Sequence, residues 1–334
     1  MEPAFPAIYS TLCPVVLSSL ITDQYELENV ECKFLVRGVG DTYFVNSQHE
    51  RFIFRVYRPT HRTLSVIEEE INLLLALKEA QVSVSYPIAD VQGAYILKIN
   101  AIEGDRHAVL FSFAPGKVVR QMSKSQLCAL GNEMARFHNV SALFQKSGAR
   151  WNFDLDTMLY QPLERLKTVF TENQEDYIWL ESKVNQIKNK FSKIDTEAFS
   201  TGYCHFDFLP KNFHFDGDSV TFFDFDFMGY GWLVNDIMTF WQHLVLDVLS
   251  KKISYDEAME AYHIFLQGYK EHRMISDLEL EMVPYLTFGF WLFYMNFHTT
   301  HDQFYAFSQP AYLKSYVGIL KDVAENYWLK EDQL

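Results

Sequence analysis

The stretch H-F-D-F-L-P-K-N occupies residues 205–212, and F-F-D-F-D follows at residues 222–226 after the turn Asp216-Gly217-Asp218. Both stretches place acidic and amide side chains among aromatic rings. Burying an unpaired carboxylate in apolar surroundings costs several kcal/mol. We therefore expect these aspartates to be ion-paired, hydrogen-bonded or bound to a metal ion.

Phosphoryl transfer explains the spacing of these polar residues. The reaction needs a carboxylate that orients the attacking hydroxyl and accepts its proton, and oxygen ligands that hold Mg²⁺ against the phosphates. A loop H-x-D-x-x-x-x-N, followed by a short hairpin that ends in aspartate, supplies these groups from one rigid substructure. The pattern predicts Asp207 as the general base, with Asn212 and Asp224 as magnesium ligands. Turn capping is the alternative role for all three, since Asp and Asn commonly cap turns.

Three neighbouring residues receive other roles. His205 is expected to order the backbone of its loop rather than to catalyse. For Asp226 two roles stay open, a second metal or substrate group and a brace of the loop. Asp236 is expected to tie the metal loop, residues 222–226, to the helix that follows.

The N-terminal third has the pattern of an antiparallel sheet. Short alternating runs between Tyr25 and Tyr57 predict three strands, and apolar residues at helical spacing predict a helix over residues 64–80. Two more strands are predicted at residues 94–99 and 107–113. Proline and glycine in Ala114-Pro115-Gly116 then break the pattern, so we place a domain boundary there and expect a β-rich domain over residues 1–114.

The remaining chain, residues 115–334, reads as a mostly helical domain. Residues 123–144 and 163–191 have helical periodicity, and three further helices are expected up to Tyr327. A β-like island at residues 203–227 carries the two motifs. The fold class is therefore α+β.

Composition argues against several classes of protein. A formal net charge of -14 would repel a nucleic-acid backbone. The four cysteines are scattered and form no C-x-x-C pair, which argues against a zinc site or a disulfide framework and fits a reducing cytoplasm. The chain has no basic signal-peptide start, and its longest apolar stretch, residues 283–297, is too short to cross a bilayer comfortably. We expect a cytoplasmic protein without nucleic-acid or membrane partners.

The sequence resembles the aminoglycoside phosphotransferase and choline kinase superfamily, which includes type II homoserine kinases. The resemblance is carried by residues 205–212 and by F-F-D-F-D-F-M-G-Y-G-W-L-V-N-D-I at residues 222–237. It implies a protein-kinase-like two-lobed fold, with a small antiparallel β-rich N-lobe and a larger helical C-lobe. It also implies that ATP and Mg²⁺ bind and that the γ-phosphoryl group passes to a hydroxyl of a small molecule.

Weaker matches follow in the order that the family has. Arg55 resembles the basic strand residue that meets the nucleotide phosphates, and Glu70 resembles its helical partner. Many kinases have lysine where this chain has arginine, so the phosphate geometry is expected to differ. The loop with Gly38 and Gly40 is expected to cover the phosphates. Residues 109–113, with Phe111 and Phe113, resemble the hinge strand that pairs with adenine.

Other functions share parts of this pattern. A protein Ser/Thr kinase uses the same chemistry, but no recognisable activation segment follows Asp224. A nucleotide-binding pseudokinase and a metal-dependent phosphohydrolase are further alternatives. An amino alcohol, a hydroxy amino acid or an aminoglycoside is the expected acceptor, because 43 acidic residues exceed 29 basic ones and the helical domain is rich in rings. Sugars fit the same loop, and the alternative is that the rings are core and the charge serves only solubility. The rings include Trp232, Trp241, Trp291 and Tyr294, and Asp226 or Asp302 would add charge.

Overall fold

A computed structural model of the chain describes residues 5–328. The chain forms two compact units. The first contains Met1–Val119 and Lys211–Asp226, and the second contains Arg120–Pro210 and Phe227–Leu334. The boundary expected between residues 114 and 115 stays a prediction. By compactness, the hairpin segment at residues 211–226 groups with the N-terminal residues.

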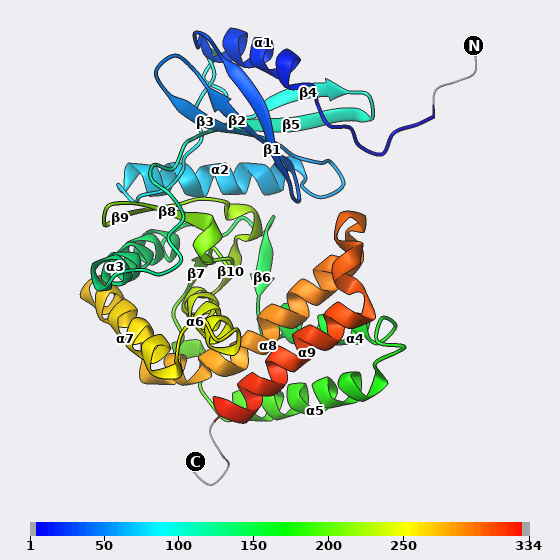
Figure 1. The fold of residues 1–334 in the computed structure, drawn as a ribbon, viewed down its shortest axis with the longest axis vertical. Helices are drawn as coiled ribbons and strands as arrows, with labels where there is room; N and C mark the ends of the chain where they lie inside the picture. The colour runs from blue at the N-terminus through cyan, green and yellow to red at the C-terminus, as the bar shows by residue number, and fades with distance from the viewer. Residues whose placement is uncertain (1–4, 329–334) are drawn as a thin grey trace. The chain divides into compact units, whose positions relative to one another are not determined.

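A five-stranded antiparallel sheet forms the centre of the first unit (Figure 1). Its strand order is β1-β2-β3-β5-β4, and every neighbouring pair is antiparallel. All five strands were predicted, with ends that differ by a few residues. Their bounds are β1 Glu31–Arg37, β2 Asp41–Asn46, β3 Arg51–Val56, β4 Leu97–Ala101 and β5 Gly104–Ser112.

Two helices cover opposite sides of this sheet (Figure 1). Helix α2, Leu64–Glu79, matches the predicted helix. Helix α1, Pro14–Tyr25, was not predicted, because proline and serine interrupt its apolar run. Pro14 stands in the first turn, where a missing N–H costs nothing, and Ser18 bonds to the Pro14 carbonyl. Leu17 and Ile21 then pack into the sheet's core.

The hairpin of β8, Phe213–Asp216, and β9, Ser219–Phe222, is fastened to the first unit by backbone bonds. Phe222 bridges to Val84, and Phe215 exchanges two hydrogen bonds with Lys117. The close approach requires glycine at residue 116, where φ is +82° and a Cβ would lie 2.0 Å from the Phe215 carbonyl oxygen. The segment after β5 is thereby held against β8.

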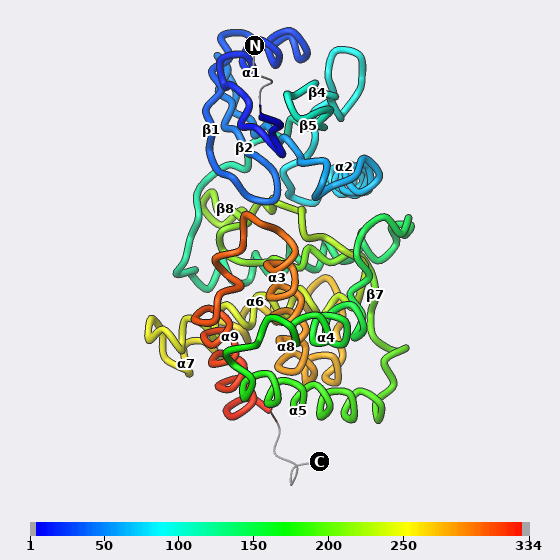
Figure 2. The backbone as a smooth tube through the Cα atoms, turned by 90° about the vertical axis from the view of Figure 1, so that its right-hand side faces the viewer, coloured from blue at the N-terminus to red at the C-terminus, as the bar shows by residue number. Residues whose placement is uncertain are grey.

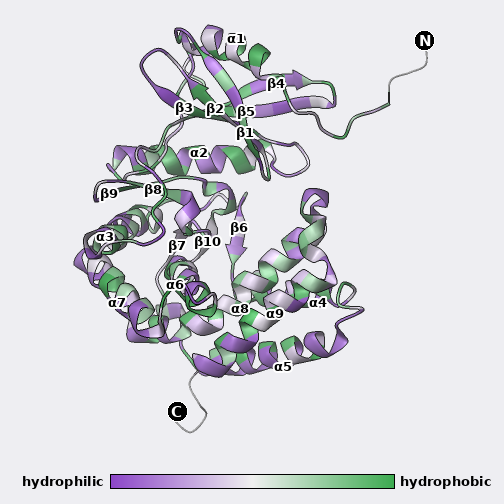
Figure 3. Cartoon of the chain, viewed as in Figure 1, coloured by the Kyte–Doolittle hydropathy of each residue, from purple (hydrophilic) through white to green (hydrophobic). Residues whose placement is uncertain are grey.

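The second unit is mostly helical and contains a three-stranded sheet. Its strand order is β6-β10-β7, with bounds Trp151–Phe153, Gly229–Trp232 and Thr201–Cys204. Helix α8 packs against α6 and α9 (Figures 1 and 2). Helix α5 buries one face and leaves hydrophilic residues on the other (Figure 3). The α-helices are α3 Lys124–Ser141, α4 Gln161–Leu166, α5 Gln174–Phe191, α6 Val234–Leu249, α7 Tyr255–His272, α8 Asp277–Thr300 and α9 Pro310–Asn326.

Some expectations for this unit were wrong. The helix predicted over residues 163–191 is two helices, α4 and α5, separated by turns at residues 167–173. Four helices, α6 to α9, rather than three follow the β island. Strand β6 was missed because three residues show no periodicity. The apolar stretch at residues 283–297 is a buried helical segment within α8, and none of the helices in residues 5–328 is long and apolar enough to span a bilayer.

Candidate active site

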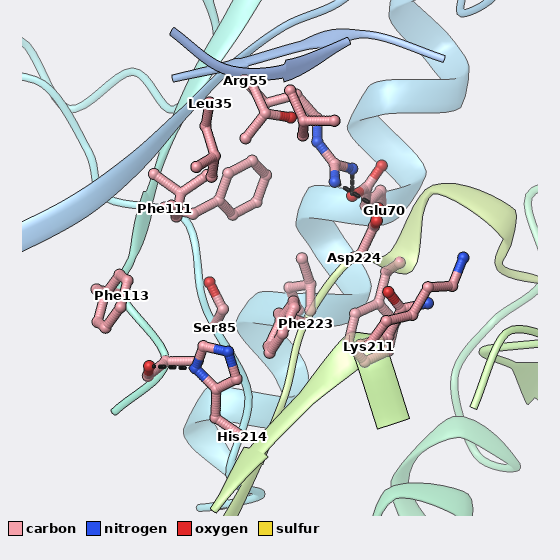
Figure 4. Close-up of a pocket in the computed structure, with 17 residues that line it drawn as sticks. Leu35, Arg55, Glu70, Ser85, Phe111, Phe113, Lys211, His214, Phe223 and Asp224 are labelled. Atoms are coloured by element: carbon pink, nitrogen blue, oxygen red, sulfur yellow. Dashed lines mark hydrogen bonds and ion pairs between the residues drawn. The ribbon is translucent and has the colours of Figure 1, made fainter. Parts of the chain in front are cut away.

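A pocket of about 330 Å³ lies in the first unit, beneath the sheet and beside α2 (Figure 4). One end is lined by rings and aliphatic groups, and the other end by charged and amide groups. Its lining residues are Leu35, Val36, Thr42, Ile53, Arg55, Glu70, Leu74, Ser85, Phe111, Phe113, Ala114, Lys211, Asn212, His214, Phe223, Asp224 and Phe225.

A β-bulge in β1 shapes the apolar end. The register between β1 and β2 shifts between Phe34 and Val36, so that Leu35 has no partner in the register on β2. The consecutive side chains of Leu35 and Val36 therefore both line the pocket, although a regular strand would send them to opposite faces. Phe111 lies beside Leu35 and Phe223 lies across from both, and these side chains form an apolar slot suited to a flat ring (Figure 4).

Arg55 marks the charged end of the pocket. Its guanidinium lies 3.7 Å from the carboxylate of Glu70, which is buried on α2, and it also pairs with Asp224. Burial alone would lower the pKa of Arg55. The carboxylates of Asp224, Asp226 and Glu70, with Tyr57, outweigh burial and hold the pKa well above its usual value. Arg55 is therefore a permanent cation that could meet phosphate oxygens.

The two predicted metal ligands both line this pocket. Asn212 is buried at the start of the β8–β9 hairpin, and Asp224 follows the hairpin with a left-handed backbone, φ 66°. Within residues 5–328 there is no cluster of three or more His, Cys, Asp or Glu side chains that could hold a metal ion. The donor set nevertheless fits Mg²⁺, which is commonly held by one or two carboxylates together with waters and substrate phosphates.

Asp226 is bound to Arg62, a residue that the sequence did not single out. Arg62 Nε donates to Oδ1 at 2.9 Å and Nη2 donates to Oδ2 at 3.2 Å, a forked contact between two buried side chains. Nη2 also donates to the backbone carbonyl of Asp226 at 3.1 Å. Because Arg62 lies just before α2, the pair holds the metal loop against that helix. Of the two open roles for Asp226, the geometry favours the brace.

Residues 205–209, which include the predicted general base, lie in the second unit. Asp207 is 4% exposed, and its backbone N–H donates to Nδ1 of His205 at 3.2 Å. Since that nitrogen accepts a hydrogen bond, the ring proton of neutral His205 is on Nε2. The position of His205 agrees with a structural role. The general-base role of Asp207 stays a prediction.

Asp236 anchors this segment, and its expected tie to the metal loop was wrong. From α6 its carboxylate accepts the backbone N–H of His205 at 2.9 Å and that of Phe206 at 2.7 Å. Phe206 has φ 64°, an unfavourable value for a bulky residue. The two bonds to a buried carboxylate stabilise this backbone conformation.

His138 on α3 also contacts the carboxylate of Asp236. Its Nε2 lies 3.0 Å from Asp236, and its Nδ1 lies 2.8 Å from the hydroxyl of Tyr269. Burial lowers the pKa of His138, and the carboxylate of Asp236 only partly opposes this. A neutral ring donates through Nε2 to Asp236 and accepts at Nδ1 from Tyr269. No local sequence pattern identifies this contact, because its members are about a hundred residues apart in the chain.

The structure thus gathers most predicted nucleotide and metal residues in one pocket. Arg55, Glu70, Phe111, Phe113, Asn212 and Asp224 line it, whereas Gly38 and Gly40 are not among the lining residues. At Gly40 a Cβ would lie 2.9 Å from the carbonyl oxygen of Val56, so close packing accounts for glycine there. A phosphate-covering role for both glycines stays a prediction. Ser85 and His214 line the pocket and were missed.

An antiparallel five-stranded sheet with its helix, followed by a larger helical unit, defines a protein-kinase-like fold. Residues 31–275 match the phosphotransferase enzyme family, and the chain belongs to that family.

The comparisons also identify individual proteins that the chain is similar to. It is 31% identical over 330 residues to an uncharacterized protein of Synechocystis sp., covering 97% of this chain and 89% of that protein. Its fold is similar to a solved amicoumacin kinase, with a TM-score of 0.72, 20% identity and 92% of each chain covered. A microcompartment-associated aminopropanol kinase gives a TM-score of 0.73 at 19% identity, over 95% of this chain and 99% of that chain.

Proposed function

We propose that the protein transfers the γ-phosphoryl group of ATP to a hydroxyl of a small molecule. The observation that carries this proposal is the pocket in which Arg55, Glu70, Asn212 and Asp224 meet at the charged end of an apolar slot. The slot suits a nucleobase, and the charged end suits a triphosphate with its metal ion. Membership of the phosphotransferase enzyme family supports the same reaction.

Each residue has a role in this reaction. Asp207 accepts the proton of the acceptor hydroxyl and orients that hydroxyl for attack. Arg55 is held in place by Glu70 and binds phosphate oxygens. When the phosphates bind, they replace part of its contact with Asp224. Asn212 and Asp224 would hold Mg²⁺, which supplies charge neutralisation at the phosphates. Support for a nucleotide and a divalent ion comes from the solved amicoumacin kinase, which holds AMP-PNP and Ca²⁺.

For the acceptor we propose an amine-bearing alcohol, such as an amino alcohol, a hydroxy amino acid or an aminoglycoside. The names of the similar amicoumacin and aminopropanol kinases support this class. The structure narrows the rings that could contact a cation. Trp241 is buried, whereas Trp232 and, on α8, Trp291 and Tyr294 are partly exposed. Asp226 is already paired with Arg62, which leaves Asp302 of the two acids considered.

A panel assay tests the proposal. Purified protein with ATP and Mg²⁺ is incubated with matched alcohols that carry or lack an amine, at low and high salt. We expect ADP to form only with an acceptor, phosphate to appear on the acceptor by mass spectrometry, and neutral analogues to react more slowly. Phosphate release that no alcohol changes would identify a hydrolase, and nucleotide binding without transfer would identify a pseudokinase. A phosphorylated protein side chain would favour the Ser/Thr kinase.

A further inference from the structure

The apolar end of the pocket contains two polar side chains, Ser85 and His214, that the proposed reaction does not use. In Figure 4 both project into the pocket beside Phe113 and Phe223, at the end away from Arg55. If the phosphates lie near Arg55, this end receives the nucleobase.

His214 reaches the slot because of the register of the hairpin. It pairs with Thr221 across β8 and β9. Because successive side chains along a strand point to opposite faces, His214 lies on the face opposite to the buried rings of Phe213 and Phe215. Its ring packs edge-on against Phe223, with ring centroids 4.7 Å apart. A polar ring thus stands beside the aromatic rings of Phe223 and Phe113.

The hydrogen bond to Ala114 fixes the tautomer of His214. Nδ1 lies 2.9 Å from the backbone carbonyl oxygen of Ala114. A carbonyl oxygen only accepts, so Nδ1 carries the proton, and Nε2 of the neutral ring is a lone-pair acceptor. In Figure 4 this second nitrogen is turned away from Ala114 and faces the pocket.

The hydroxyl of Ser85 also donates its proton to a backbone carbonyl. The acceptor is the carbonyl oxygen of Ser112 at 2.6 Å, so the single proton of the hydroxyl is used. The hydroxyl oxygen still has lone pairs, and the residue lines the pocket. Both polar side chains at this end therefore present acceptors, because each donates its proton to a backbone carbonyl, that of Ser112 at the end of β5 and that of Ala114 just after it.

We propose that Ser85 and His214 select the nucleobase by accepting hydrogen bonds from an exocyclic amine. Adenine has two N–H donors on its 6-amino group. Hypoxanthine and guanine have a carbonyl oxygen at that position, which would face the two acceptors with no proton between them. A site built to bond a donor rejects an analogue that lacks it, because buried polar groups are left unpaired. The inference rests on the proposed function, in which this pocket binds ATP. It goes further by naming the two side chains that distinguish ATP from ITP and GTP.

The test compares ATP with ITP, which replaces the 6-amino group by a carbonyl. Dissociation constants are measured by calorimetry with Mg²⁺ and no acceptor, and kcat/KM values follow with the best acceptor. We expect wild-type protein to prefer ATP by at least about tenfold. His214→Leu and Ser85→Ala should each reduce the ATP/ITP ratio by about three- to tenfold. The double variant should bring the ratio close to one.

Two further variants separate base reading from a structural role. In His214→Gln the amide nitrogen can donate to the carbonyl of Ala114 while the amide oxygen faces the pocket. The ATP/ITP ratio should therefore be closer to that of wild type than the ratio of His214→Leu is. Thr221→Val alters the same face of the hairpin at a residue that does not line the pocket, and should leave the ratio unchanged.

The outcomes separate the inference from the proposed function. If His214→Leu weakens ATP and ITP equally, the ring only supports the segment at Ala114 and the inference is wrong. Equal affinity of folded wild-type protein for the two nucleotides also overturns it, while the proposed function stands. If neither nucleotide binds, both fail together.

Discussion

Asp207 carries the most direct prediction at the scale of single residues. Asp207→Asn keeps the size of the side chain and the backbone bond to His205, but it removes the proton acceptor. Turnover should fall at least about a hundredfold, with the dissociation constant for ATP nearly unchanged. Asp216→Asn, at the exposed hairpin turn, serves as the control. Turnover equal to wild type in Asp207→Asn would remove the residue from the mechanism.

Arg55 tests whether a fork is needed at the phosphates. One guanidinium contacts both Glu70 and Asp224, which a lysine ammonium cannot do with the same geometry. Arg55→Ala should raise the KM for ATP, and Arg55→Lys should recover only part of the loss. Steady-state kinetics with ATP as the varied substrate measures both. Full recovery by lysine would mean that Arg55 supplies simple charge.

At the scale of elements, the sequence predicted what depends on local pattern. Alternation revealed β1 to β5, and helical spacing revealed α2. The pattern is clearest where one face is buried, as in β2, β3 and α2. Helix α1 was not predicted because Pro14, Ser18 and Ser19 interrupt its apolar run, although Pro14 is acceptable in a first turn. The bulge at Leu35 was hidden as well, since a register shift arises from pairing with β2.

The candidate site likewise contains residues that local spacing predicts and residues that only tertiary contacts reveal. The acidic and amide residues of the two motifs could be assigned from spacing, because the chemistry fixes their order. The partners of Asp236 and Asp226 could not, since His138 and Arg62 come from distant segments. The acceptor roles of Ser85 and His214 depend on bonds to backbone carbonyls, which no side-chain pattern reveals.

The contact between α6 and residues 205–209 yields a prediction for stability. Asp236→Asn leaves one oxygen for the N–H groups of His205 and Phe206 and brings an amide donor toward them. We expect the free energy of unfolding to fall by about 1.5–3 kcal/mol, the range typical of hydrogen bonds to charged groups. Urea denaturation measures the change. Asp256→Asn, at an exposed residue in the first turn of α7, is the control and should stay within about 0.5 kcal/mol. A similar loss in both variants would refute the anchor.

At the scale of the whole molecule, the chain combines a strongly acidic composition with buried and half-buried histidines. Burial lowers the pKa of His138, His243 and His298, all of which belong to the second unit. The folded state disfavours the charged form of these rings, whereas in the unfolded chain they bind a proton at the ordinary pKa of histidine. The helical unit should therefore lose stability in mildly acidic solution for a reason separate from the titration of carboxylates.

His298 sets the range of pH for this effect. Burial, with a smaller contribution from the nearby charge of His301, lowers its pKa from 6.5 to about 4. Between these values the unfolded chain binds a proton that the folded chain does not, so stability is complete above about pH 6.5 and falls as the pH drops toward 4. Each such proton contributes at most about 1.4 kcal/mol per pH unit, and less for this ring because it is partly exposed to solvent. His298→Gln should lose stability less steeply than wild type over that range, as followed by thermal unfolding at a series of pH values. NMR titration gives an independent check, since the ring protons of His298 should titrate near pH 4. A titration midpoint near 6.5, or parallel stability curves for the two proteins, would show that the folded chain does not disfavour the charged ring.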